Sequence, residues 1–210
     1  MKKSIFKEGK KYTFRDYFDF QIFSENPFGL FLILSRYKFA AKLANPSDIV
    51  IDIGCGKGIG TTMLAHYCRE VVGIDYMEES ILTANRRNCL KNLTFKTADA
   101  RNYSNDKKFN LVVSLDVIEH MPQEDARALL KNSKELLTTD GFAVIGTPNI
   151  NSAQYASPER RQAHVYEYSY NEFRKLLEEH FKRVIIFSMT DETVNTSFHE
   201  MAWYFMALCF

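Results

Sequence analysis

The sequence lacks a charge imbalance, a long apolar run and a cysteine motif, and each absence excludes a class of protein. Lys and Arg number 27 against 26 Asp and Glu, giving a formal net charge of +1, so no strong field favours nucleic acid or an anionic membrane. The longest apolar run, residues 29–34, is far shorter than the roughly 20 residues that span a bilayer. The four cysteines have no C-x-x-C spacing, which favours reduced thiols over zinc or disulfides.

A secretory signal is also missing, because no apolar segment follows the lysines near the first residue. We therefore expect a cytoplasmic protein. Its 210 residues are 46% apolar and 14% aromatic, enough for one globular domain with a sizeable core. We expect a single domain over residues 1–210, with an N-terminal helical cap over 1–46 and a core over 47–210.

The strongest functional signal is an apolar stretch, residues 49–53, that runs into a glycine-rich turn. The stretch is β-branched and interrupted only by Asp52, which is typical of a central strand in a parallel sheet. In the turn, Gly54, Gly56 and Gly58 can adopt positive φ and let a ligand approach the backbone, at the start of a helix whose amides face that ligand. The pattern predicts a binding site.

An acidic residue at the end of the next strand narrows the ligand class. Asp75 ends residues 71–75, about 20 residues after the first glycine, where a carboxylate binds ribose hydroxyls of a dinucleotide or of S-adenosylmethionine. Ile59 stands where a dinucleotide fingerprint has its third glycine. Asp52 would repel a pyrophosphate but suits an ammonium group beside a sulfonium. The sequence favours S-adenosylmethionine.

At this point the chain resembles the class I S-adenosylmethionine-dependent methyltransferases. The segments that carry the resemblance are residues 50–58, 72–75, 97–100, and 109–121 followed by 141–149. The resemblance implies that the glycines surround the methionine part, that Asp75 takes the ribose, that Tyr76 lies by the adenine and that Asp99 contacts the adenine amino group. The complete set expected to bind S-adenosylmethionine is Asp52, Gly54, Cys55, Gly56, Gly58, Asp75, Tyr76, Asp99, Ala100 and Leu115.

The remainder of the chain alternates helical and strand patterns, as βαβ units require. We expect an α/β fold with a doubly wound, Rossmann-like sheet of about seven strands, helices on both faces and an antiparallel last strand. Asn26 and Pro27 predict an N-cap and first helical residue. The expected strands are 49–53, 71–75, 93–97, 111–114, 142–147, 183–188 and 203–210; the helices after the first are 59–68, 78–89, 123–137 and 171–181.

Two long connections, residues 148–169 and 189–201, are expected to form the acceptor pocket, because long loops in compact domains are often functional. The first contains His164, which can accept the proton of a hydroxyl nucleophile. His120, just after the fourth strand, is a second candidate, and His199 is an outside one. The predicted catalytic residues are His164, His120 and Asp116.

The sequence leaves two alternatives for the site, with and without a divalent metal. Asp116, Glu119 and His120 are spaced i, i+3 and i+4, so they would share one face of a helix. A Glu-x-x-Glu-His run here binds a divalent metal in ubiquinone-pathway O-methyltransferases and small-RNA 2′-O-methyltransferases, and this chain resembles both locally. Asp116 replaces the first Glu, and Asp-x-x-Glu-His also occurs in metal-free members. We expect no metal; the alternative requires Glu119, His120 and His164 to converge.

The predicted function is methyl transfer to a hydroxyl, or less readily an amine, of a small molecule or sugar, without a nucleic-acid or membrane partner. Residues 164–173 resemble methyltransferases of surface-polysaccharide or secondary-metabolite pathways, and residues 36–40 resemble a helix that borders the acceptor site in sugar methyltransferases. The rival within the enzyme class is a metal-dependent, ubiquinone-type aromatic O-methyltransferase. Rivals from other classes are a nicotinamide-dependent dehydrogenase and a non-catalytic cofactor-binding subunit.

Overall fold

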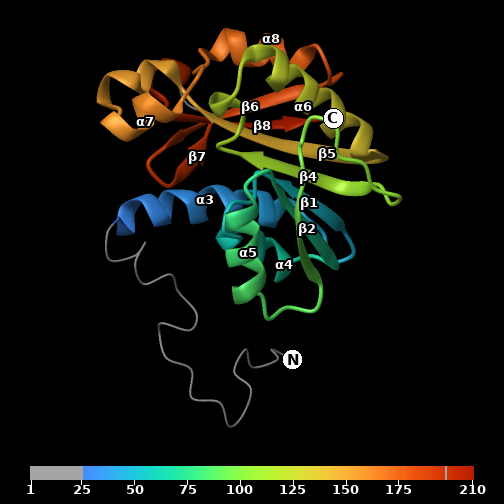
Figure 1. Cartoon of the computed structure of the whole chain (residues 1–210). Coiled ribbons are helices and arrows are strands. Elements are labelled where there is room, and N and C mark those ends of the chain that lie inside the picture. The colour runs from blue at the N-terminus through green and yellow to red at the C-terminus, as the bar shows by residue number, and fades with distance from the viewer. Residues whose placement is uncertain (1–25, 197) are drawn as a thin grey trace.

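The structure is a computed structural model that describes residues 26–196 and 198–210. Of the cap predicted over residues 1–46, the first 25 residues therefore lie outside the described part. Within it, eight strands form one sheet in the order β3-β2-β1-β4-β5-β8-β6-β7 (Figure 1). The strands are β1 Ile49–Ile53, β2 Glu70–Asp75, β3 Leu93–Thr97, β4 Phe109–Leu115, β5 Leu137–Pro148, β6 Val184–Thr190, β7 Thr193–Asn195 and β8 Tyr204–Cys209.

Strands β1 to β5 are parallel to one another, and β8 lies antiparallel between β5 and β6. This confirms the predicted doubly wound sheet with an antiparallel last strand. The added strand is β7, a short edge strand in a hairpin with β6. All five β1 residues are buried, as its apolar sequence predicts. Chain order reverses between β1 and β4, so the ligand crevice is expected outside their carboxyl ends.

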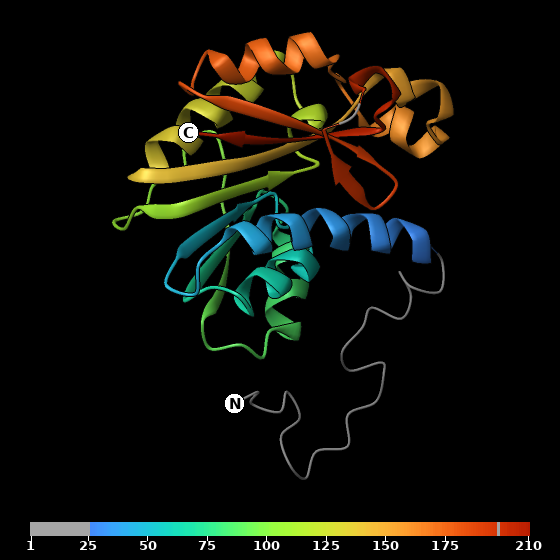
Figure 2. The same ribbon diagram turned by 180° about the vertical axis from the view of Figure 1, so that it is seen from behind.

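Helices cover both faces of the sheet (Figures 1 and 2). Buried side chains of α3, α4 and α5 pack on one face, and those of α6 and α8 pack on the other. The helices are α3 Pro27–Leu43, α4 Ile59–Ala65, α5 Glu78–Arg87, α6 Gln123–Leu136, α7 Pro158–Ala163 and α8 Tyr170–Glu178. Asn26 Oδ1 accepts the Gly29 amide at 2.8 Å, which confirms the predicted N-cap. Among the described residues, no helix is both long and apolar enough to cross a membrane.

The two long connections are more ordered than expected. The first contains the 3₁₀ helix η2 Ile150–Tyr155 and then α7; the second contains β7 and the 3₁₀ helix η3 His199–Met201. The sequence does contain helix-capping residues in the first connection, but each capping signal is only one or two residues long. Asn149 caps η2, and Ser157 caps α7 ahead of Pro158. Polar residues that indicated loop are therefore caps that satisfy helix amides.

Candidate active site

The glycine turn between β1 and α4 leaves space in front of one glycine. Gly54, Gly56 and Gly58 have φ of 74°, 50° and 82°, in the left-handed region that favours glycine. A Cβ at Gly54 would lie 2.3 Å from Val117 Cγ2, and one at Gly58 would lie 2.5 Å from Phe95 Cζ, whereas one at Gly56 would meet nothing within 4 Å. Gly54 and Gly58 thus leave no room for a side chain, whereas Gly56 faces open space. Cys55, within the turn, is buried.

Asp75 joins the end of β2 to this turn. Its Oδ2 accepts the Gly56 amide and its Oδ1 accepts the Met77 amide, both at 2.9 Å. The side chain is half-buried, and each carboxylate oxygen can accept a further bond. The structure therefore places Asp75 beside the open glycine, where a ribose contact was predicted.

Asp52, in β1 just before the turn, is closed off from solvent. It has no exposed surface, and its carboxylate accepts Thr61 Oγ1 at 2.6 Å and the Tyr37 hydroxyl at 3.2 Å. Burial raises its pKa to about 7. A direct contact with a ligand's ammonium group does not fit this burial. Instead Asp52 joins β1 to α3 and α4.

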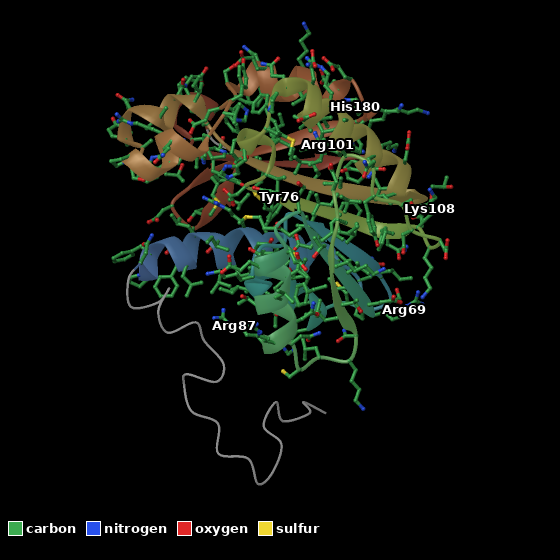
Figure 3. The ribbon with its side chains drawn as sticks, in the orientation of Figure 1. Arg69, Tyr76, Arg87, Arg101, Lys108 and His180 are labelled. Atoms are coloured by element: carbon green, nitrogen blue, oxygen red, sulfur yellow. The ribbon has the colours of Figure 1, made fainter. Side chains whose placement is uncertain are left out.

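The residues predicted on the adenine side follow β2, β3 and β4. Tyr76 is 78% exposed and is labelled with Arg101 in Figure 3. Asp99 accepts Arg101 Nη2 at 2.6 Å and Nε at 3.0 Å, and these bonds lower the Asp99 pKa. The Ala100 carbonyl accepts Asn132 Nδ2 at 2.9 Å, and Leu115 is buried at the end of β4. Asp99 already has a cationic partner, so an adenine contact would add to that pair.

The segment after β4 is not the helical face that the spacing of Asp116, Glu119 and His120 predicts. Asp116 has φ of 58°, and only Ile118–His120 form a short 3₁₀ helix, η1. Both Asp116 oxygens lie 2.7 Å from Nη1 of Arg36 in α3. Its amide donates to the Tyr204 hydroxyl at 3.1 Å. Because the left-handed residue breaks the helical repeat, Asp116 pairs with α3 and stands apart from the other two.

Glu119, His120 and His164 do converge. Their ligand-type atoms all lie within 4.8 Å of one another, and the two imidazole rings are 4.8 Å apart at 89°. Glu119 is fully buried. Its Oε2 accepts Thr147 Oγ1 at 3.1 Å, while Oε1 is buried and has no partner within the described residues. Burial raises the Glu119 pKa to about 8.

Each histidine is oriented by an acceptor behind it. His120 Nδ1 lies 3.0 Å from the Ala163 carbonyl, and His164 Nδ1 lies 2.6 Å from Glu167 Oε1. Because both partners can only accept, both Nδ1 atoms carry the proton, and the Nε2 of a neutral ring is then free to accept a proton or to bind a metal. Arg160 holds Glu167 through bonds of 2.8 and 2.9 Å. Burial lowers the His164 pKa, which favours the neutral ring.

The other histidines lie outside this cluster. His199 Nδ1 is 2.8 Å from Ser188 Oγ, and its ring stacks on Tyr170 at 3.9 Å. His66 follows α4 as its C-cap. His180, labelled in Figure 3, follows α8. The structure therefore brings together His164 and His120 of the three predicted catalytic residues, adds Glu119 and leaves Asp116 with Arg36.

Comparisons with known proteins found similar sequences and similar folds among methyltransferases. Residues 50–141 match the family described as a methyltransferase domain. A ubiquinone biosynthesis O-methyltransferase of Pelagibacter ubique is 30% identical over 109 residues, which cover 50% of this chain and 44% of that protein. A Rickettsia bellii protein of the same name is 29% identical over 133 residues, 62% of this chain and 54% of the relative. The chain thus spans about half the length of the curated relatives it matches.

A solved structure with a similar fold is the N-methyltransferase NodS from Bradyrhizobium japonicum in complex with S-adenosyl-L-homocysteine. Its TM-score is 0.66 at 20% identity, with 89% of each chain covered. This likeness concerns the fold, and that complex places the product of S-adenosylmethionine in such a fold.

Proposed function

We propose that this chain is a class I S-adenosylmethionine-dependent methyltransferase that transfers a methyl group to a hydroxyl of a small molecule or sugar. The observation that supports this most is the position of the histidine cluster beside the glycine turn. Val117, which contacts the Cβ position of Gly54, directly precedes η1 with Glu119 and His120. The segment that carries Glu119 and His120 therefore begins at a side chain that packs against the turn, which is expected to hold the methionine part of the cofactor.

When bound, S-adenosylmethionine supplies an electrophilic methyl group on a sulfonium. The chain must hold an acceptor oxygen in line with the methyl–sulfur bond. As the oxygen–methyl bond forms and the methyl–sulfur bond breaks, we infer that His164 Nε2 takes the hydroxyl proton. Glu167 holds His164 in the required tautomer and stabilises the imidazolium that results. Asp116 is not the base of this proposal, because Arg36 already occupies its carboxylate.

His164→Ala should lower turnover roughly 10²-fold or more and leave cofactor affinity almost unchanged, as expected for loss of a general base. His120→Ala should lower both, because His120 follows β4 three residues after Val117, which lies against the position of a Cβ on Gly54. Turnover is measured by a mass-shift screen with labelled S-adenosylmethionine and candidate sugar nucleotides, phenols and amines. His66→Ala is the matched control, since His66 is exposed at the end of α4 and lies outside the cluster. A fully active His164→Ala enzyme would exclude the base role.

Cofactor choice tests the proposal more broadly. The protein should bind S-adenosylmethionine and S-adenosylhomocysteine, and neither NAD nor NADP. Asp75 suits a ribose, but Ile59 stands where a dinucleotide-binding turn has its third glycine, and Asp52 before the turn disfavours a pyrophosphate. Calorimetry with each compound measures this directly. Dinucleotide binding without S-adenosylhomocysteine binding would favour a dehydrogenase. Cofactor binding without methylation of any acceptor class would favour a non-catalytic subunit.

A second candidate function is metal-dependent O-methylation, and the convergence of Glu119, His120 and His164 favours it. These residues fit a divalent cation: Glu119 Oε1 has no partner in the part of the chain that the structure describes, and the Nδ1 atoms of the two imidazoles are oriented by acceptors, as in many metal sites. Such a cation would polarise the acceptor hydroxyl and lower its pKa. The relatives named ubiquinone biosynthesis O-methyltransferases support the same class of acceptor.

The two mechanisms differ in their response to chelation. If a metal is used, EDTA should abolish turnover, added divalent cations should restore it, and Glu119→Gln should match both histidine variants. Calorimetry with Mn²⁺ or Zn²⁺ gives a readout that does not depend on the acceptor. Full turnover in EDTA, with no cation binding to the parent protein, would leave the metal-free base mechanism.

A further inference from the structure

A small pocket lies where the end of β5 meets the start of α8 and the 3₁₀ helix η3. Its volume is about 200 Å³, below the roughly 300–1,000 Å³ of sites for drug-sized ligands. A group the size of a single six-membered ring would fill it. None of Glu119, His120 and His164 lines the pocket, so it is distinct from the histidine cluster.

Part of the pocket wall is aromatic. The rings of Tyr170 and His199 stack at 3.9 Å and 11°, and both lie edge-on to Phe205, at 5.9 Å and 6.5 Å. Ser188 Oγ also holds His199, at 2.8 Å from its Nδ1. Because these contacts fix the three rings, this part of the wall is a rigid apolar surface, with His199 Nε2 as an additional polar atom.

The remaining wall is polar and carries one negative charge. Its exposed side chains are Asn151, Asn171 and Glu200. Each side-chain amide offers both donors and an acceptor, and the carboxylate offers acceptors only. Among the described residues that line the pocket, none is lysine or arginine. The wall can therefore bond hydroxyl groups, whereas Glu200 disfavours a phosphate or a carboxylate.

A buried amide fixes the shape of the pocket. Asn149 is 1% exposed, and its Nδ2 donates to the carbonyls of His199 at 3.2 Å and Ala202 at 2.8 Å. Its Oδ1 accepts the Asn151 amide at 3.1 Å. One side chain thus joins the end of β5, η2 and η3, so binding in the pocket requires little reorganisation.

Two short stretches of chain connect the pocket to the histidine cluster. Thr147, two residues before Asn149, donates to Glu119 Oε2 at 3.1 Å. Glu167, which bonds His164, lies two residues before the first pocket residue on the α8 side. Because two residues span at most about 7 Å of chain, one acceptor molecule can occupy both the pocket and the cluster.

We propose that this pocket binds an uncharged sugar ring of the acceptor, while a neighbouring hydroxyl of the acceptor lies at the histidine cluster. This inference rests on the proposed function, because it assumes an acceptor that reaches His164. The C–H groups of a sugar ring pack on the aromatic wall, and its hydroxyl groups bond Asn151, Asn171 and Glu200. A benzene ring of similar size would displace water from these polar groups without replacing its hydrogen bonds.

Saturation-transfer NMR on the full chain, with and without S-adenosylhomocysteine, tests the pocket directly. The probes are glucose, galactose and mannose, with glucose 6-phosphate as the anionic alternative and catechol as the aromatic one. The variants Asn171→Ala and Glu200→Ala each remove an exposed side chain of the pocket. Asn85→Ala, at an exposed position of α5, is the matched control.

At least one sugar should bind, and both pocket variants should weaken its binding roughly 3- to 10-fold, as for loss of a hydrogen bond. Asn85→Ala should bind like the parent. Glucose 6-phosphate should bind more weakly than glucose, and Glu200→Gln should narrow that difference, because it removes the negative charge and keeps the shape. In turnover, Asn171→Ala should raise KM for a sugar acceptor and leave kcat nearly unchanged.

Three results would overturn the inference. The first is that none of the three sugars binds, and the second is that the pocket variants leave sugar binding unchanged. The third is that catechol binds more tightly than the sugars and responds to the same variants.

The two proposals can fail separately. Methylation of a phenol or an amine, with no sugar bound in the pocket, contradicts the sugar site and leaves the methyltransferase proposal standing. Sugar binding that the pocket variants weaken, without S-adenosylhomocysteine binding or turnover, supports the pocket and contradicts the proposed function.

Discussion

Asp75 is the residue whose position and predicted role agree best. Its two backbone contacts fix the carboxylate beside Gly56, and a ribose would add charge-assisted bonds worth roughly 1.5–3 kcal/mol each. Asp75→Ala should therefore weaken S-adenosylhomocysteine binding at least tenfold. Calorimetry measures the loss, and Asp140→Ala, at an exposed residue near the start of β5, is the control. Parent-like binding by Asp75→Ala would contradict the ribose assignment.

Single residues could be predicted from the sequence where a short spacing determines their neighbours. Asp75 and the glycines are of this kind, because strand, turn and helix follow each other within a few residues. Arg36 and Asp116 are 80 positions apart, and only the packing of α3 against β4 brings them together. Asp52 shows the converse, since its neighbours in sequence do not reveal that Tyr37 and Thr61 close it off.

At the scale of elements, strands were easier to predict than the turns between them. The parallel strands are apolar and β-branched, so their pattern alone indicates burial. For the segment after β4 the predicted helical face was wrong, because i, i+3 and i+4 spacing implies a shared face only in a regular helix. The left-handed Asp116 interrupts that repeat. Edge strand β7 has only three residues, too few for a periodic signal.

The glycine turn allows a prediction about the element as a whole. Gly56→Ala places a methyl group in open space, and the positive φ costs about 1–2 kcal/mol. Gly58→Ala adds a clash with Phe95 to the same backbone strain. Gly58→Ala should therefore lower the melting temperature more, whereas Gly56→Ala should lower S-adenosylhomocysteine affinity more than its stability loss explains.

Thermal unfolding and calorimetry on both variants separate the two effects. Because the variants share the same substitution and differ in what the new Cβ meets, each is the control for the other. Equal affinity for the parent and Gly56→Ala would mean that no ligand approaches the turn at that position.

At the scale of the whole molecule, the sheet divides the protein into a face covered by α3, α4 and α5 and a face covered by α6 and α8. The candidate site uses the edge between them, where parallel strands end together. Glu119 and His164 come from distant parts of the chain and meet after β4, while Asp75 stands at the carboxyl end of β2. The sequence motifs predicted this edge of the sheet. The contacts across it depend on where η2, α7 and the antiparallel strand β8 lie.

Asp52 links this architecture to pH, because it joins β1, α3 and α4 in the centre of the fold. Burial raises its pKa to about 7 in the folded protein, against about 3.9 for an unperturbed aspartate. Between these values the folded state keeps a proton that the unfolded state has lost. The contribution of Asp52 to stability is therefore fully present below pH 3.9 and is lost as pH rises towards 7, by about 1.4 kcal/mol per pH unit.

Asp52→Asn removes this titration and keeps a side chain of the same shape. Other groups titrate equally in both proteins, so the difference between the two free energies of unfolding isolates Asp52. We expect the variant to gain stability relative to the parent as pH rises from 5 to 7, and the difference to become constant above about pH 8. Urea unfolding at half-unit pH steps measures it. A pH-independent difference would mean that Asp52 is ionised throughout, with Thr61 and Tyr37 sufficient to hold the buried charge.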